Sequence, residues 1–192
     1  MNQEQFEKAL EKQPSTVDWL WANQVINNSI DKLSYGKLQL VTVMEEFAEL
    51  LEMIELYRQH PYGLSLSHRI HLIEELADTL LGLRYVSNIL YYDEITQYDE
   101  SYIIEHSFVN HLLTAIQMLS KFVRGAKNTP RTRPEHYRAT LGKALQGIYD
   151  GVHSMQLKYG ISNEELNRAM MVKLKRQEKR NKDGVKDTLS IA

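Results

Sequence analysis

VMEEFAELLEM, residues 43–53, places apolar side chains three or four positions apart, and so does LIEELADTLLG, residues 72–82. This period matches the α-helix and predicts two amphipathic helices, each with one apolar stripe. The first stripe consists of Val43, Phe47, Leu50, Leu51 and Ile54. The second consists of Leu72, Leu76, Leu80 and Leu83. Because each stripe needs a partner, we expect the two helices to form an antiparallel pair over residues 37–91.

The same period continues outside this pair. It predicts helices over residues 3–13, 16–30, 37–59, 67–91, 104–124, 134–158 and 163–182. No stretch alternates apolar and polar residues as a half-buried strand does, and there is no hairpin signal. Ser162 precedes Glu165 by three positions, which is the pattern of a capping box at the start of the last helix. We therefore predict an all-α protein with a single domain over residues 1–192.

Composition narrows the class of protein. The formal net charge of −2 gives no general attraction to nucleic acid, so we predict no nucleic-acid partner. Cysteine is absent, which excludes disulfides and thiol chemistry and fits a reducing compartment. The polar N-terminal segment has no apolar signal core, and no apolar run approaches the roughly 20 residues of a membrane span. These features favour a cytoplasmic protein without a membrane partner.

Four carboxylates lie along the edges of the two stripes. Glu46 and Glu49 border the first stripe, and Glu75 and Asp78 border the second in the same phase. Packing the stripes together brings the four side chains toward one place, where like charges repel unless a cation neutralises them. Oxygen ligands without histidine or cysteine favour Mg²⁺, Mn²⁺ or Ca²⁺, and Mg²⁺ commonly binds substrate phosphates as well. The four residues are therefore the predicted metal ligands.

A plainer interpretation of these acids is a solvated helix surface, which explains most single E-x-x-E patterns. Two such patterns in matching phase, beside two apolar stripes, strengthen the case for a metal site, but the pattern alone leaves both interpretations open. Four further acids lie farther from the stripes, and we predict that they are ordinary surface charge: Glu45, Glu52, Glu55 and Glu74.

The order of the acids resembles the signature of a known superfamily. EEFAE, residues 45–49, is followed at a distance by ELAD, residues 75–78. This arrangement is similar to that of the all-α nucleoside triphosphate pyrophosphohydrolases, which include MazG-type enzymes, dimeric dUTPases and phosphoribosyl-ATP pyrophosphohydrolase. The resemblance implies a MazG-like bundle, a homodimer, and Mg²⁺-dependent cleavage of a (deoxy)nucleoside triphosphate to the monophosphate and pyrophosphate. It also implies that Glu46 and Glu49 are catalytic, with Glu49 orienting or deprotonating the attacking water.

A basic stripe lies near the end of the chain, in VKLKRQEKRNKDG, residues 172–184. Lys173, Arg176 and Arg180 fall on one side of the predicted helix and flank its apolar face. Cations near a helix C-terminus also complement the helix dipole, but that effect is confined to the last turn. The resemblance implies that the three cations contact substrate phosphates, as the closing helix of phage-type dimeric dUTPases does. We expect the polar tail, residues 183–192, to be flexible and to order over those phosphates.

Base recognition is assigned through the same resemblance. dUTPase-type relatives read uracil with amides of an N-terminal segment, and this chain offers such amides at Gln24, Asn27 and Asn28. Trp21 or Trp19 is the candidate stacking surface. Asparagine-rich helix ends and buried tryptophans also occur without any such role. The aromatic-rich run expected after the first acidic helix of a dUTPase is missing, so dUTP, dCTP and modified nucleotides stay open as substrates.

The second half of the chain, residues 104–182, is a candidate degenerate copy of the acidic pair. LLTAIQMLSKFVR aligns with LVTVMEEFAELLE and puts Met118 at the position of Glu46. Any two amphipathic helices align to this extent, so unrelated helices are an equal alternative. A true repeat predicts one site on a pseudo-symmetric bundle.

Two further functions stay open beside the pyrophosphohydrolase. A helical protein that binds nucleotides or partners without turnover would keep the same bundle. A phosphohydrolase with another substrate, such as phosphoribosyl-ATP or a signalling nucleotide, would keep the same acids. Pyrophosphate release from a panel of triphosphates, with and without Mg²⁺, distinguishes the three functions.

Overall fold

The chain is built from α-helices wherever its structure is described. The computed structural model describes residues 3–34, 36–59, 65–90, 104–125 and 135–183, so the predicted tail beyond residue 183 lies outside the described part. The described residues contain no strand, which confirms the predicted all-α class, and none of their helices is long and apolar enough to cross a membrane. They form seven helices: α1 (Gln3–Leu10), α2 (Trp19–Ser29), α3 (Lys37–Gln59), α4 (Leu66–Leu90), α5 (Ile104–Arg124), α6 (Glu135–Lys158) and α7 (Asn163–Lys182).

The helix boundaries agree with the sequence period except near the N-terminus. The sequence predicts a helix from residue 16, whereas α2 begins at Trp19. Asp18 explains the difference, because its side chain accepts hydrogen bonds from the amides of Leu20 and Trp21 and caps the helix there. Likewise α1 ends at Leu10, short of the predicted end at residue 13.

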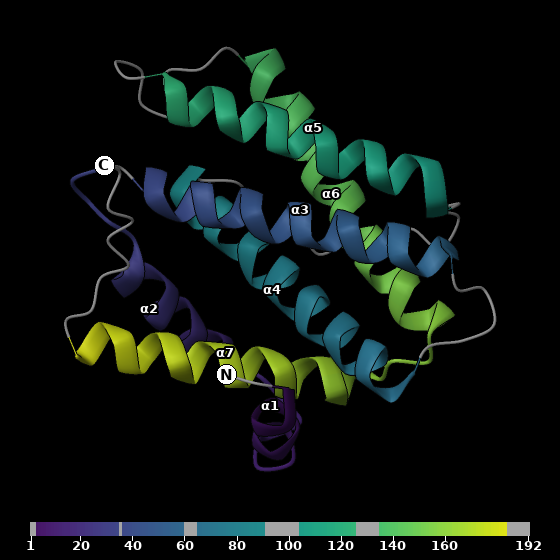
Figure 1. Cartoon of the computed structure of the whole chain (residues 1–192). Coiled ribbons are helices and arrows are strands. Elements are labelled where there is room, and N and C mark those ends of the chain that lie inside the picture. Colours follow the sequence, from purple (N-terminus) through teal and green to yellow (C-terminus); the bar gives the residue numbers. More distant parts are fainter. Residues whose placement is uncertain (1–2, 35, 60–64, 91–103, 126–134, 184–192) are drawn as a thin grey trace.

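The helices lie in three layers, with α3 and α4 in the middle (Figure 1). The pair α5 and α6 covers one side, where α5 packs against α3 and α6 packs against α4. On the other side α7 packs against α4 and carries α2 and α1. Because α4 touches helices of both outer layers, its buried side chains occur all around the helix, not along one stripe.

The two predicted stripes meet in the core between α3 and α4. Phe47 and Leu50 of α3 and Leu72 and Leu76 of α4 are all 0% exposed. Leu51 and Leu80, at the margins of the stripes, are only half-buried. Burying a leucine or phenylalanine side chain contributes roughly 1.5–3 kcal/mol, so this interface fixes the relative position of the two helices.

A tight turn joins α6 to α7. The amide of Ile161 donates to the carbonyl of Gln156 at 2.9 Å and the amide of Gly160 donates to that of Leu157 at 3.4 Å, which is a Schellman motif. Gly160 has φ of 60°, a left-handed conformation that glycine adopts without strain. Ser162 then caps α7, and the predicted capping box with Glu165 is confirmed. The direction in which α7 leaves α6 is therefore set by local hydrogen bonds.

An ion pair aligns α7 with α4. The guanidinium of Arg69 donates to both carboxylate oxygens of Glu165, at 2.6 and 3.1 Å, and to the carbonyl of Gly160 at 3.1 Å. About two and a half turns farther along both helices, Lys173 of α7 contacts Asp78 of α4. The two contacts show that α4 and α7 run parallel, and the first contact fixes the register of the second.

The helices α5 and α6 form a second pair that packs most closely at two glycines. A Cβ at Gly147 would lie 2.2 Å from the ring of His111, and a Cβ at Gly151 would lie 2.2 Å from that of Phe108. Only glycine allows so close an approach. A second helix pair is what a degenerate repeat requires, but packing does not test common origin, and the repeat stays a prediction.

We expect Glu165→Gln to destabilise the protein at neutral pH by about 1 kcal/mol, since the Arg69 pair is partly exposed and screened. This corresponds to a fall in Tm of about 2–4 °C. Arg69 lowers the pKa of Glu165 from 4.5 to about 2, so the stabilisation is complete above pH 4.5 and is lost as the pH falls toward 2. Thermal unfolding of wild type and variant between pH 2 and 7 measures the difference.

Glu164→Gln is the matched control, because Glu164 lies in the same first turn and is exposed. It removes the same helix-dipole interaction but leaves Arg69 paired. Equal effects of the two variants at pH 7 would show that the ion pair adds nothing to stability.

Candidate functional site

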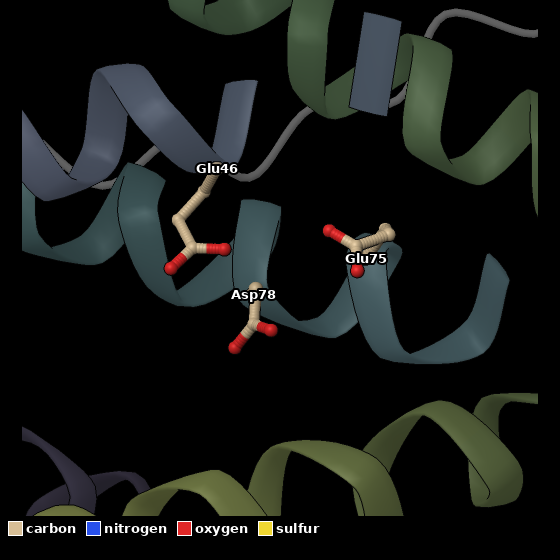
Figure 2. Close-up of side chains that lie close together, drawn as sticks. All are labelled: Glu46, Glu75 and Asp78. Atoms are coloured by element: carbon tan, nitrogen blue, oxygen red, sulfur yellow. The ribbon is translucent and has the colours of Figure 1, made fainter. Parts of the chain in front are cut away.

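Three acids converge between α3 and α4 (Figure 2). Glu46 comes from α3, and Glu75 and Asp78 come from successive turns of α4. One carboxylate oxygen of each lies within 4.8 Å of the other two. The packing of the neighbouring Phe47 against α4 leaves Glu46 at the rim of the interface, facing this group. The structure thus brings together three of the four predicted metal ligands.

Glu75 is the most buried of the three acids, at 6% exposure. Its Oε1 lies 3.1 Å from Nε2 of His71, one turn earlier on α4. Its Oε2 is buried and has no hydrogen-bond partner among the described residues. A buried oxygen without a partner leaves its desolvation uncompensated, and a bound cation would supply the missing interaction.

Burial and repulsion shift the pKa values of all three acids. Burial, with the charges of Asp78 and Glu49, raises the pKa of Glu46 from 4.5 to about 8. Burial and the charges of the neighbouring acids raise the pKa of Glu75 from 4.5 to about 8 as well. Burial also raises the pKa of Asp78, while the ammonium group of Lys173 opposes that rise. In the metal-free protein at neutral pH, protons therefore supply part of the neutralisation that a divalent cation would supply.

Glu49, the fourth predicted ligand, lies outside the converging group. Its side chain is exposed on α3. Its charge nevertheless raises the pKa values of Glu46, Glu75 and Asp78, so it lies close enough to act on them. An exposed carboxylate at the edge of the group is placed to contact water.

Lys173 reaches the acids from α7. Its Nζ donates to Oδ2 of Asp78 at 2.5 Å and to Oε1 of Glu74 at 2.6 Å. Burial lowers the pKa of Lys173, but Asp78 and Glu74 outweigh burial and the net shift is upward. A predicted phosphate ligand is thus paired with a predicted metal ligand in the metal-free protein.

Glu74 corrects one of the sequence predictions. Glu45, Glu52 and Glu55 are exposed, as predicted for surface charge. The prediction is wrong for Glu74, which is half-buried against Lys173. Glu74 and Asp78 are four positions apart and so share a face of α4, and this spacing is the signal in the sequence for their common partner.

A pocket of about 560 Å³ extends from the acids along α3, α4 and α7. Its charged end is lined by Glu46, Asp78, Lys173 and Arg176, and Arg180 lines it farther along α7. The pocket follows α4 from Asp78 to Tyr85, a length of about 10 Å. The three predicted phosphate-binding cations thus share one pocket with two of the predicted metal ligands.

The far end of the pocket holds Asp31 and Arg180 beside uncharged polar side chains. Ser29, Gln39 and Tyr85 line it, and none of them was singled out by the sequence patterns. The hydroxyl groups of Ser29 and Tyr85 lie 2.7 Å apart, and the amide nitrogen of Gln39 donates to the carbonyl of Ser29 at 2.9 Å. These contacts join the end of α2 to α3 and α4, which no periodicity within one helix could indicate.

Of the residues assigned to base recognition, only Asn28 lines this pocket. The indole N–H of Trp21 donates to Glu178 at 3.3 Å, and Asn27 accepts a hydrogen bond from Asn88 at 3.0 Å. Gln24 is exposed and lies outside the pocket lining. The positions of Trp21, Gln24 and Asn27 give no support to a role in base recognition.

The donor set fits a small divalent cation. Octahedral Mg²⁺ ligands at about 2.1 Å from the ion lie roughly 3–4 Å apart. Oxygens within 4.8 Å of one another can reach this spacing through small side-chain rotations. Glu46, Glu75 and Asp78 offer only oxygen, and the oxygen of Glu75 that has no hydrogen-bond partner is available as a ligand atom.

Comparisons with family models, curated proteins and solved structures find no match to this chain.

We expect Glu75→Gln to stabilise the metal-free protein at high pH. Glu75 ionises near pH 4.5 in the unfolded chain but keeps its proton up to about pH 8 when folded, so it destabilises the fold progressively as the pH rises through this window. Glutamine resembles the protonated acid. The free energy of unfolding at pH 9 should rise by on the order of 1–2 kcal/mol, with little change at pH 4.

Urea unfolding in the presence of EDTA, at pH 4, 7 and 9, measures this difference. Glu52→Gln serves as the control, since Glu52 is an exposed acid on α3. If Glu75→Gln destabilised the protein at pH 9, Glu75 would be held as a paired, ionised carboxylate and the electrostatic account above would fail.

Proposed function

We propose that this protein is a Mg²⁺-dependent nucleoside triphosphate pyrophosphohydrolase, which converts a (deoxy)nucleoside triphosphate and water to the monophosphate and pyrophosphate. One observation carries the proposal: a single pocket joins the converging acids to the basic stripe of α7. Acids that bind a divalent cation and cations that bind phosphates are the two requirements of phosphate chemistry. Both requirements are met by the same residues that resemble the all-α pyrophosphohydrolase superfamily.

The acids divide into ligands and a base. Glu46, Glu75 and Asp78 would hold the metal, which when bound would neutralise phosphate oxygens and lower the pKa of the attacking water. Glu49, exposed beside the group, would orient that water and accept its proton. The water oxygen forms the new bond to phosphorus, and the bond broken separates the monophosphate from pyrophosphate.

The arrangement of charges in the pocket indicates how a nucleoside triphosphate would be oriented in it. Lys173 and Arg176 at the charged end would contact the phosphates and neutralise charge that develops during cleavage. The nucleoside would then extend toward the far end of the pocket, beside Asn28 and Tyr85. The volume of about 560 Å³ lies within the range of small-molecule sites and suits a ligand of this size. We retain dUTP and dCTP as candidate substrates and a homodimer as the expected assembly.

A non-catalytic nucleotide-binding protein is the second candidate. The contact between Lys173 and Asp78 favours it, since a lysine that neutralises a metal ligand lets the fold persist without metal. Turnover separates this candidate from the enzyme.

We expect Glu46→Gln and Asp78→Asn to lower turnover at least about 100-fold, because each removes a metal ligand. Both variants should remain folded, because each relieves repulsion among the acids and because Lys173, which loses one partner in Asp78→Asn, keeps Glu74. Pyrophosphate release from a panel of ribo- and deoxynucleoside triphosphates, with Mg²⁺ and with EDTA, measures the effect. Circular dichroism and thermal unfolding confirm folding, and Glu52→Gln again serves as the surface control. Full activity of both variants would refute the metal assignment.

We expect Arg176→Gln to raise KM for the triphosphate by roughly 10- to 100-fold, the value of one hydrogen bond between charged groups. Affinity for Mn²⁺ without nucleotide should stay unchanged, because Arg176 contacts none of the three acids in the described structure. Lys175→Gln is the control, as Lys175 is exposed on the same helix outside the pocket lining. Equal effects of the two variants would mean that Arg176 has no direct contact with the substrate.

A further inference from the structure

Glu74, Lys173 and Asp78 form an ion triad that links α4 to α7. The ammonium of Lys173 lies 2.6 Å from Glu74 and 2.5 Å from Asp78. The side chain of Lys173 is 17% exposed, that of Glu74 is 26% exposed and that of Asp78 is 15% exposed. The ring of Phe6 in α1 covers the ammonium from another side, with its centroid 5.6 Å from Nζ. Lys173 therefore has little access to water and depends on its two carboxylates.

The two carboxylates of the triad differ in whether they lie near the other acids. Asp78 is a member of the converging group with Glu46 and Glu75, whereas Glu74 is not. Glu75 also keeps a buried oxygen without a hydrogen-bond partner among the described residues, and a divalent cation bound in this group would supply one. Lys173 is thus shared between one acid that is suited to bind metal and one acid that is not.

Metal binding changes what Lys173 can contact. An Asp78 oxygen that is bonded to a divalent cation is a weaker acceptor for an ammonium, and the cation repels that ammonium as well. A buried ammonium left without a partner is costly. Glu74 is the carboxylate that can keep Lys173 neutralised once Asp78 is given to the metal.

We propose that Glu74 is a positioning residue, which retains Lys173 when the metal takes Asp78 and so makes the metal site accessible. The inference rests on the metal site of the proposed function and adds a role for a residue outside that site. Lys173 acts as an internal competitor for Asp78, and Glu74 weakens this competition. A substrate phosphate gives Lys173 a further acceptor, so metal and nucleotide bind with positive coupling, which is reciprocal.

A double-mutant cycle on Mn²⁺ affinity tests the proposal. Isothermal titration of the full chain without nucleotide compares wild type, Glu74→Gln, Lys173→Gln and the double variant. We expect Lys173→Gln to bind Mn²⁺ about 10-fold more tightly, because the competitor is gone. Glu74→Gln should bind about 10-fold more weakly, yet have less than about a 2-fold effect in the Lys173→Gln background.

Glu45→Gln controls for the loss of one negative charge near the site. Glu45 is exposed beside Glu46 and acts on the pKa of Glu46 by its charge. It should weaken Mn²⁺ binding slightly and equally in both backgrounds. If Lys173→Gln does not fold, Lys173→Met takes its place in the cycle. The methionine side chain fills nearly the same space beside Phe6 as the lysine side chain does.

The outcomes separate the two proposals. An equal effect of Glu74→Gln with and without Lys173 would show that Glu74 acts only as a nearby charge, which overturns this inference and leaves the metal site standing. Failure of the wild type to bind Mn²⁺ would overturn the metal site and this inference together. An effect of Glu74→Gln that disappears without Lys173 supports the proposed role.

Discussion

The burial of like charges at one helix interface is the constraint on which the site depends. Glu46, Glu75 and Asp78 lie together between α3 and α4, where burial and repulsion favour their protonated forms. Such a group persists only where surrounding packing fixes it, and α4 is packed by helices of both outer layers. The unfavourable free energy of burying these like charges favours the binding of a divalent cation, because a cation bound among the carboxylates neutralises their charge.

The rest of the fold places a positive charge, that of Lys173, at a defined position along α4. The Schellman motif and the cap at Ser162 set the direction of α7, and the contact of Arg69 with Glu165 sets its register. Parallel helices then place Lys173 beside Asp78. The basic stripe would have no such defined partners on a helix free to slide, so the position of Lys173 depends on contacts about two and a half turns away.

The pocket joins these contacts along three helices. Glu46, Asp78, Lys173 and Arg176 line one end of it, while Asp31 and Arg180 lie among the polar side chains of the other end. The proposed function depends on this geometry together with the resemblance of the acidic motifs.

The sequence by itself determined the helices, the core stripes and the side of each helix on which Glu46, Glu75 and Asp78 lie, because these follow from a period within each helix. Only the tertiary structure decided that Glu74 pairs with Lys173 and that Glu49 stays exposed. Likewise it placed Asn28 in the pocket and left Gln24 outside. A helical wheel gives the angle of a side chain about its own axis, but the neighbour it meets depends on how other helices cross and in which register, and distant residues set both.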